Sequence, residues 1–407
     1  MTESWLGTGT WNDQIGPRDQ ACPHLSTTSP EFHDDFDAVV ASARAQCPVA
    51  WDEGGKRWIV LAGEQLMQVA QDIETYSSAY GVGGPHYPKL LPMDADEPEH
   101  RQWRRPLNPL FTRAVHDEQR PDIRRIADEL IDDLIGKGTA EFIADFCRPL
   151  PGRVFFQLII DLPQEDLEHL QHIVEMTVDP TDPEKQAAAA IQLGAYVQKL
   201  VDERRAGPRT DDLIGRVVFA EINGEQASAA DAVSTLTMII LGGLETTTNT
   251  LAGALARLGS DPELQAKLRA DRGLVRPAVE EFLRLYAPTS FLTRYVTQDA
   301  ELEGLSIKQG QRVALSFAAA NRDPEIFEDP LEFRLDRPHN RHYAFGIGPH
   351  RCVGSNLARA VMHEAVNAIL DRLDEIRWAP GFTPRYRHAN VRALEEVELE
   401  FTAASGS

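Results

Sequence analysis

Apolar residues recur every three to four positions along most of the chain, which is the period of a helix with one buried face. This pattern predicts helical segments at residues 36–44, 64–72, 99–136, 139–205, 211–285 and 355–373. The fourth of these is expected to divide into several helices, and the fifth to have two interruptions. Within the third segment we expect breaks at Pro106, Pro109 and Pro121, because proline removes a helical hydrogen bond and clashes with the preceding turn. Most of the chain is therefore expected to be helical.

Alternating apolar and polar residues predict short strands in three other regions. Residues 48–62 form a candidate hairpin around a Gly-Gly turn, and residues 294–314 and 383–402 alternate in the same way. Residues 81–98 and 327–350 are rich in glycine and proline, which predicts irregular loops. With no repeat and no linker, we expect a mainly α fold with small β-sheets. A loose lead-in at residues 1–30 would precede one large domain at residues 31–407.

Composition and charge exclude several classes of function. The 407 residues include 41 Lys and Arg against 63 Asp and Glu, a net charge of −22, so binding to nucleic acid is disfavoured. The four cysteines are widely spaced and form no CxxC pair, which argues against a disulfide scaffold and a zinc ribbon. With no signal peptide and no long apolar run, we expect a cytoplasmic protein without a membrane anchor.

One cysteine has unusual neighbours. Residues 345–354 read F-G-I-G-P-H-R-C-V-G, so glycines let the backbone approach a ligand closely just before Cys352. His350 and Arg351 can lower the pKa of this thiol, and the helix predicted from Ser355 places its N-terminus beside it. A thiolate presented in this way suits a single metal–sulfur bond rather than a zinc site with four ligands.

This decamer matches F-x-x-G-x-H-x-C-x-G, and the chain therefore resembles the cytochrome P-450 family of haem-thiolate monooxygenases. The resemblance implies the mostly helical, single-domain fold of that family and haem b as cofactor. It also implies that Cys352 is the axial ligand of the iron, whose thiolate donates electron density. Phe345, Gly346, His350 and Gly354 would then lie against the haem.

A second stretch agrees with this resemblance. Between Asp231 and Arg257 the only charge is Glu245, in the centre of L-G-G-L-E-T-T-T-N. Two adjacent glycines inside a helix cost about 1–2 kcal/mol, which calls for a reason such as the close approach of a flat ligand. The stretch is similar to the family's [AG]-G-x-[DE]-T motif, with Glu245 where many members carry Asp. The similarity implies that Thr246 hydrogen-bonds dioxygen and that Glu245 relays protons.

Further motifs follow in the family's order. Glu281 and Arg284 form an E-x-x-R pair, and Arg337 ends a stretch similar to D-P-x-x-F-x-x-x-R. The resemblance assigns these three a structural role behind the haem. Four other residues would contact the haem propionates, namely His100 and Arg104 on one helix face, Arg294 and His350.

The resemblance implies insertion of one oxygen atom from O2 into a C–H bond of a small hydrophobic substrate, by hydroxylation or O-demethylation. Candidate substrates are a terpenoid, an alkyl- or methoxy-aromatic, or a steroid. The expected pocket includes His86, Tyr87, Leu241, Gly242, Leu244, Thr289 and Leu292. Three alternatives remain open, namely a haem protein that binds or senses a ligand without turnover, a peroxide-dependent hydroxylase, and an oxidase of a carrier-bound metabolite.

Electrons are expected from a separate ferredoxin and its NAD(P)H-dependent reductase, because no second cysteine cluster is present. A ferredoxin is typically acidic and would require a local basic patch on this acidic protein. The candidates for that patch are Arg101, Arg104, Arg105 and Arg351.

Overall fold

The computed structural model describes residues 20–81, 89–178, 182–387 and 392–404, and helices make up most of it. Its α-helices are α1 Pro30–Asp34, α2 Phe36–Gln46, α3 Gly63–Gln71, α4 Glu99–Leu107, α5 Arg113–Leu134, α6 Pro149–Val154, α7 Leu167–Val178, α8 Pro183–Ala206, α9 Leu213–Val218, α10 Ala229–Ser260, α11 Pro262–Ala270, α12 Val275–Tyr286, α13 Phe317–Ala320 and α14 Ser355–Arg372. A 3-10 turn at Asn108–Phe111 joins α4 to α5, and a π-helical turn at Phe155–Ile160 follows α6.

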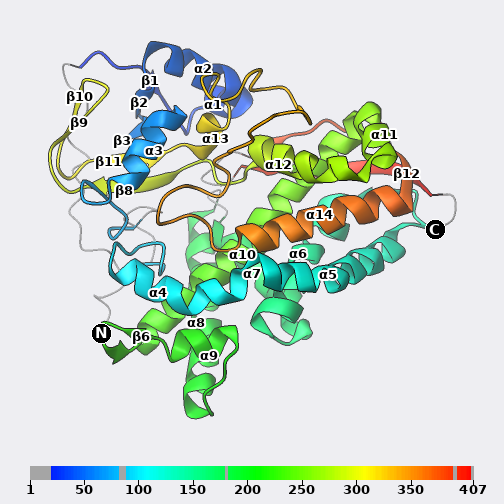
Figure 1. The fold of residues 1–407 in the computed structure, drawn as a ribbon, viewed down its shortest axis with the longest axis horizontal. Helices are drawn as coiled ribbons and strands as arrows, with labels where there is room; N and C mark the ends of the chain where they lie inside the picture. The colour runs from blue at the N-terminus through cyan, green and yellow to red at the C-terminus, as the bar shows by residue number, and fades with distance from the viewer. Residues whose placement is uncertain (1–19, 82–88, 179–181, 388–391, 405–407) are drawn as a thin grey trace.

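The strands lie in separate groups, with the main sheet at one side of the molecule and a smaller sheet near the C-terminus (Figure 1). They are β1 His24–Leu25, β2 Val49–Asp52, β3 Arg57–Val60, β4 Tyr76–Ser77, β5 Thr139–Glu141, β6 Glu221–Ile222, β7 Glu225–Gln226, β8 Leu292–Val296, β9 Ala300–Leu302, β10 Leu305–Ile307, β11 Arg312–Leu315, β12 Leu373–Trp378, β13 Tyr386–Arg387, β14 Ala393–Leu394 and β15 Glu398–Ala403. The main sheet has the order β1-β2-β3-β11-β8-β4, and a smaller one has the order β12-β15-β5.

Helix α10 is the longest helix of the described chain and connects two apolar cores. Its first half, with Leu236 and Ile240, packs in one core against α7, α8 and α9. Its second half, with Leu251 and Leu255, packs in the other core with residues of α5, α12 and α14. Between these halves the sequence turns polar at residues 245–250, so the middle of the helix is where polar chemistry can enter an otherwise apolar interior.

Most of the predicted elements are confirmed. The helices at residues 36–44, 64–72 and 355–373 correspond to α2, α3 and α14, and the hairpin at residues 48–62 is formed by β2 and β3. The alternating regions contain β8–β11 and β13–β15, and residues 327–350 are irregular. Two details differ. Strand β5 opens the segment at residues 139–205 that was expected to be helical, and Leu25 of β1 is buried in the sheet although it lies in the expected lead-in. The β6–β7 hairpin is one interruption of the predicted segment at residues 211–285.

The predicted helix breaks at Pro106 and Pro121 are wrong. Both prolines lie inside helices, α4 and α5, and only Pro109 falls where the α-helix gives way to a 3-10 turn. In α5 the residues that follow Pro121 bury a continuous apolar face, including Ile123, Ile126 and Leu130. Each such side chain contributes about 1.5–3 kcal/mol, and together they exceed the cost of about 3 kcal/mol that proline imposes on a helix interior.

No helix in the described part of the chain combines the length and the apolar character needed to span a membrane.

The two adjacent glycines of α10 have different surroundings. A Cβ built on Gly243 would lie 2.9 Å from ring carbons of Phe155, which is itself 2% exposed. A Cβ on Gly242 would meet only the flexible end of Met238, at 3.3 Å. The close approach that explains Gly243 is therefore made by a phenylalanine ring rather than by a ligand, whereas Gly242 borders more open space.

We predict that Gly243→Ala lowers the free energy of unfolding by about 1–3 kcal/mol, because the buried Phe155 ring must move. Gly242→Ala is the matched control, and we expect it to be neutral or to stabilise by up to about 1 kcal/mol through helix propensity. Urea unfolding followed by circular dichroism on both variants measures the difference. Equal effects of the two substitutions would contradict the packing assigned to Phe155.

Candidate functional site

The loop before α14 holds Cys352 in a defined position. Gly346 and Gly348 have φ values of +66° and +73°, in the left-handed region that favours glycine. A Cβ at Gly348 would also lie 2.9 Å from the carbonyl oxygen of Ala70, so this loop packs tightly under α3. The backbone N–H of Cys352 donates to the carbonyl of Phe345 at 2.8 Å, which closes the loop.

Opposing electrostatic effects act on Cys352. Burial raises the pKa of its thiol, and a hydrogen bond from the Gly354 backbone together with the charges of Arg104, Arg351 and Arg359 partly offset that rise. The residue nevertheless keeps accessible surface, so its surroundings contain an opening. Among the described residues, no group of three or more His, Cys, Asp or Glu side chains is placed to hold a metal. A metal bound to the protein through Cys352 alone would need further ligands from a cofactor.

The middle of α10 is also partly accessible. Leu241, Gly242 and Thr246 are partly exposed, whereas residues 239–240 and 248–250 of the same helix are buried. The Thr246 hydroxyl donates to the Gly242 carbonyl at 2.8 Å, and the Asn249 amide donates to a Glu245 carboxylate oxygen at 3.0 Å. The polar side chains of this segment are thus held by their own helix.

Cationic and hydrogen-bonding side chains from three parts of the chain meet beside the Cys352 loop. The rings of His100 on α4 and His350 lie 4.2 Å apart between centroids. Arg104 donates to the Arg351 carbonyl at 2.8 Å, which connects α4 to the loop. Arg294 of β8 is 5% exposed and donates a hydrogen bond to the Thr293 carbonyl at 3.1 Å. We refer to His100, Arg104, Arg294 and His350 as the cationic cradle.

The cradle carries positive charge that is poorly solvated. Burial lowers the pKa of Arg294 to about 10, and the more distant Asp96 and Asp94 only partly offset this effect. Burial, followed by the charges of Arg294, His100 and Arg104, lowers the pKa of His350 to about 2. His350 is therefore neutral and can donate one hydrogen bond. A buried guanidinium that lacks a closely paired carboxylate favours an anionic ligand.

Trp103 lies on the same helix as His100 and Arg104 but belongs to an apolar core. This tryptophan of α4 is 0% exposed, and its indole N–H has no hydrogen-bond partner within the described residues. Because it has no accessible surface, it does not border the opening beside Cys352.

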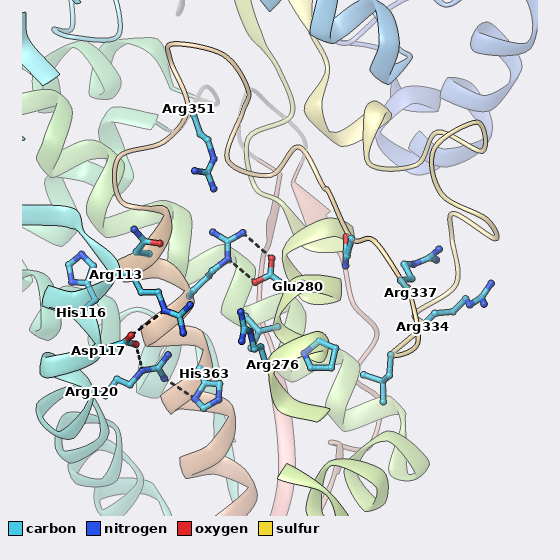
Figure 2. A pocket seen from close by; sticks show the side chains of 16 residues that line it. Arg113, His116, Asp117, Arg120, Arg276, Glu280, Arg334, Arg337, Arg351 and His363 are labelled. Carbon is cyan, nitrogen blue, oxygen red and sulfur yellow. Dashed lines mark hydrogen bonds and ion pairs between the residues drawn. The ribbon is translucent and has the colours of Figure 1, made fainter. Parts of the chain in front are cut away.

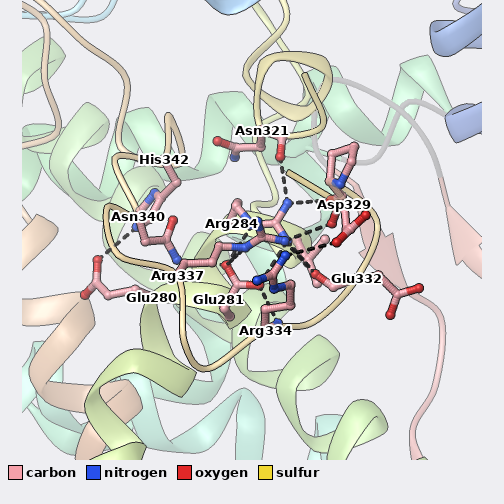
Figure 3. Close-up of polar contacts among 12 residues, drawn as sticks. Glu280, Glu281, Arg284, Asn321, Asp329, Glu332, Arg334, Arg337, Asn340 and His342 are labelled. Carbon is pink, nitrogen blue, oxygen red and sulfur yellow. Dashed lines mark hydrogen bonds and ion pairs between the residues drawn. The ribbon is translucent and has the colours of Figure 1, made fainter. Parts of the chain in front are cut away.

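Behind the loop lies a buried ion cluster (Figure 3). Arg284 donates two hydrogen bonds to Glu281, at 2.8 and 2.9 Å, and Arg337 donates a third at 3.0 Å. Glu281 also accepts from the Asn340 side chain and the Arg334 backbone, both at 2.9 Å. Burial would raise the pKa of Glu281, but these partners outweigh it and lower the pKa. The cluster ties α12 to the irregular chain that precedes Cys352.

Comparison with known proteins identifies the family. Residues 154–375 match the family model for cytochrome P450, which is more than half of the chain. A biotin biosynthesis cytochrome P450 of Bacillus subtilis is 33% identical over 324 residues, 78% of this chain and 81% of that protein. The chain belongs to the cytochrome P450 family. It is therefore an oxidoreductase that binds haem b through a thiolate and incorporates oxygen from O2.

Other relatives cover the chain more fully. A steroid C26-monooxygenase of Mycolicibacterium smegmatis is 31% identical over 371 residues, 89% of this chain and 92% of that protein. The structure of CYP109E1 from Bacillus megaterium in complex with testosterone has a TM-score of 0.82 at 26% identity, covering 92% of this chain and 99% of that one. The predicted P450 fold in a single domain is thereby confirmed.

The described residues fit haem b. The group carries two carboxylates and one iron, and the cationic cradle and Cys352 supply anion partners and a single thiolate beside each other. Gly346 and Gly354 leave the loop open at its surface, since a Cβ on either would meet no atom closer than 3.8 Å. Cys352 would bind the iron, and the cradle would hold the propionates.

The expected substrate-pocket residues differ in their exposure. Leu241, Gly242, Thr289 and Leu292 are each half-buried and keep accessible surface. Leu244, by contrast, is 2% exposed and lies within an apolar core, so its assignment to the pocket is wrong. Residues two apart on a helix point to nearly opposite sides, so Leu244 faces away from Gly242. His86 and Tyr87 lie outside the described residues.

We predict that Cys352→Ser removes the red-shifted Soret band of the ferrous–carbon monoxide form. A serine hydroxyl has too high a pKa to replace the thiolate as a donor of electron density. Difference spectroscopy of the reduced protein measures this band, with Cys147→Ser as a control at a buried cysteine outside the site. A retained band in the Cys352 variant would mean that another residue binds the iron.

Proposed function

We propose that this P450 inserts one oxygen atom from O2 into a C–H bond of a compact hydrophobic molecule, by hydroxylation or O-demethylation. Terpenoids, alkyl- or methoxy-aromatics and steroids are the candidate substrates. Two observations support this class. The partly accessible residues expected in the pocket, namely Leu241, Thr289 and Leu292, carry no charge, and two of the relatives described above are named for a steroid reaction or have testosterone bound.

The proposed roles of the residues follow from their places in the structure. Haem b supplies the oxygen-activating chemistry when bound. Cys352 would hold its iron, with Phe345, Gly346 and Gly354 shaping the loop around that ligand. On α10, the Thr246 hydroxyl donates to the Gly242 carbonyl, and the Glu245 carboxylate accepts a hydrogen bond from Asn249. This pair can hold and pass protons, which favours turnover with O2 over a peroxide-dependent reaction or ligand binding without turnover.

The substrate class is tested by titration of the holoprotein with a small library while the haem spin state is followed by absorbance. We expect type I shifts with steroids, terpenes or methoxy-aromatics and none with charged analogues of equal size. A peptide- or carrier-linked acyl chain belongs in the same library, because one structural relative is described in complex with an acyl carrier protein carrying a fatty acid. Binding of the carrier-linked ligand alone would favour a tethered substrate.

We predict that Thr246→Ala leaves the substrate dissociation constant nearly unchanged but lowers the coupling of NAD(P)H to product about tenfold or more. The substitution removes a positioned hydroxyl, so reducing equivalents leave as hydrogen peroxide. The measurement compares product, peroxide and NAD(P)H consumed in the same reaction. Thr248→Ala is the control, because that hydroxyl is buried and donates to Leu244. Unchanged coupling in the Thr246 variant would assign proton delivery to another group.

We further propose that electrons come from a ferredoxin and an NAD(P)H-dependent reductase, and that the enzyme is cytoplasmic. Of the four arginines expected to form the docking patch, Arg105 and Arg351 are exposed. Arg101 is 80% exposed and pairs with Glu97 at 3.3 Å. Arg104 is directed toward the loop, where it donates to the Arg351 carbonyl. Arg104 is thus better suited to the haem than to the partner.

A basic cavity extends this patch (Figure 2). It has a volume of about 600 Å³ and lies between α5, α12 and α14, with Arg351 pointing into it from the Cys352 loop. Its wall contains Arg113, Arg120, Arg276, Arg334, Arg337, Arg351 and Arg359 and two carboxylates, Asp117 and Glu280. Carboxylates outside the wall also pair with some of these arginines, namely Glu364 with Arg120, Glu281 with Arg337, and Glu328, Asp329 and Asp336 with Arg334. In a chain with a net charge of −22, such a surface complements an acidic ferredoxin.

We predict that Arg105→Glu slows ferredoxin-dependent reduction several-fold at low salt and that the difference shrinks as salt rises. Arg105 is a cleaner site than Arg101, because a glutamate at position 101 would face Glu97, which contacts His100 of the cradle. Lys267→Glu on α11 is the control with the same change in charge. Stopped-flow reduction across a salt series measures the effect, and equal rates for both variants would place docking elsewhere.

A further inference from the structure

An ion pair lies between the basic cavity and the Cys352 loop. Arg359 of α14 donates to both carboxylate oxygens of Glu280 on α12, at 2.7 and 2.9 Å. The two side chains are only 28% and 23% exposed. A two-point contact of this kind fixes the plane of the guanidinium as well as its position. Figure 2 shows Glu280 below Arg351.

His342 secures the pair from the protein side. Its Nε2 lies 3.0 Å from Glu280, while its Nδ1 lies 3.2 Å from the backbone N–H of Ala344. Because a backbone N–H can only donate, Nδ1 accepts and Nε2 carries the proton given to Glu280. Burial lowers the pKa of His342, which agrees with this neutral form. The imidazole thus bridges Glu280 to the start of the Cys352 loop.

Arg359 also contacts the loop itself. Its guanidinium carbon lies 4.5 Å from the centroid of the Phe345 ring, a cation–π distance. Phe345 is the residue whose carbonyl accepts the hydrogen bond from the Cys352 backbone. A further hydrogen bond runs from Arg359 to the Ser355 carbonyl in the first turn of α14, at 3.3 Å. The positive charge is therefore held behind the loop by contacts on both sides of Cys352.

The charges of this group lower the pKa values of the acidic groups beside them. Burial would raise the pKa of Glu280, but its bonds to His342 and Arg359 outweigh that and lower the pKa to about 2. Glu280 is therefore ionised at neutral pH. Arg359 in turn is one of the charges that lower the pKa of the Cys352 thiol against the effect of burial. Removing Glu280 would leave the positive charge less neutralised, and removing Arg359 would leave a negative charge behind the thiolate.

We propose that Arg359 is a positioning residue for the Cys352 thiolate, and that Glu280 and His342 fix the place of its charge and so set the reduction potential of the haem. This proposal rests on the proposed role of Cys352 as iron ligand. Ferrous haem carries one negative charge more than ferric haem, so a positive charge behind the thiolate favours the ferrous form. The opposite charges of the two partners then predict opposite effects.

The test measures the reduction potential of substrate-free holoprotein by dye-coupled titration. We expect Arg359→Met to decrease the ratio of ferrous to ferric haem several-fold at a fixed solution potential. We expect Glu280→Gln to increase that ratio, and Arg359→Lys, which keeps the charge but loses the two-point contact, to fall between Arg359→Met and the parent. Arg276→Met is the matched control, since it removes an exposed charge from the same cavity without contacting the loop.

Shifts of opposite sign separate an electrostatic role from a purely structural one, because loosening of the loop would move both variants in the same direction. Shifts of the same sign in the Arg359 and Glu280 variants, or a shift in the Arg276 control as large as that of Arg359→Met, would overturn the proposal. The ferrous–carbon monoxide spectrum of each variant is recorded in parallel. Loss of the red-shifted band from the parent would instead count against Cys352 as the ligand.

Discussion

A cysteine thiolate beside an apolar interior needs compensating positive charge, and several parts of this structure supply it at Cys352. Burial opposes ionisation of the thiol, while the Gly354 backbone and the charges of Arg104, Arg351 and Arg359 favour it. Arg351 belongs to the loop itself, and the other two arginines come from other parts of the fold. Arg104 comes from α4 and Arg359 from α14, where Glu280 of α12 fixes it. The loop is thus joined to three helices through the charges that its cysteine requires.

Polar groups also enter the apolar interior at the middle of α10. Helix α10 is buried in two cores, yet its middle carries Glu245 and Thr246 on the side where Gly242 leaves space. Their hydrogen bonds to neighbouring positions of α10 satisfy part of their polarity without a second element. A reactive group can therefore lie between α10 and the Cys352 loop, with apolar packing excluding bulk water on either side.

Sequence analysis succeeded where a signal is local and failed where it depends on distant contacts. The glycines around Cys352 and the spacing of Glu281 and Arg284 are local, and the structure places these residues together in the loop and the ion cluster. The contact between Glu280 and Arg359 joins positions 79 residues apart, and no periodic pattern marks it. The breaks expected at Pro106 and Pro121 failed for a similar reason, because the tertiary burial that offsets a proline is absent from the local sequence. Leu244 could have been assigned correctly from helical period alone, since it lies two residues from Gly242.

The distribution of charge connects this interior to the surface. Most of the excess negative charge is solvated, whereas arginines collect at the cavity beside the Cys352 loop. Solvated charges act over about one Debye length, so they steer an approaching protein without altering the thiolate. Arg359 differs from the rim arginines because it reaches Phe345 of the loop and is partly withdrawn from solvent. The same wall would thus serve the two proposed functions at different depths, with its exposed arginines governing association with the ferredoxin and its half-buried arginine acting on Cys352.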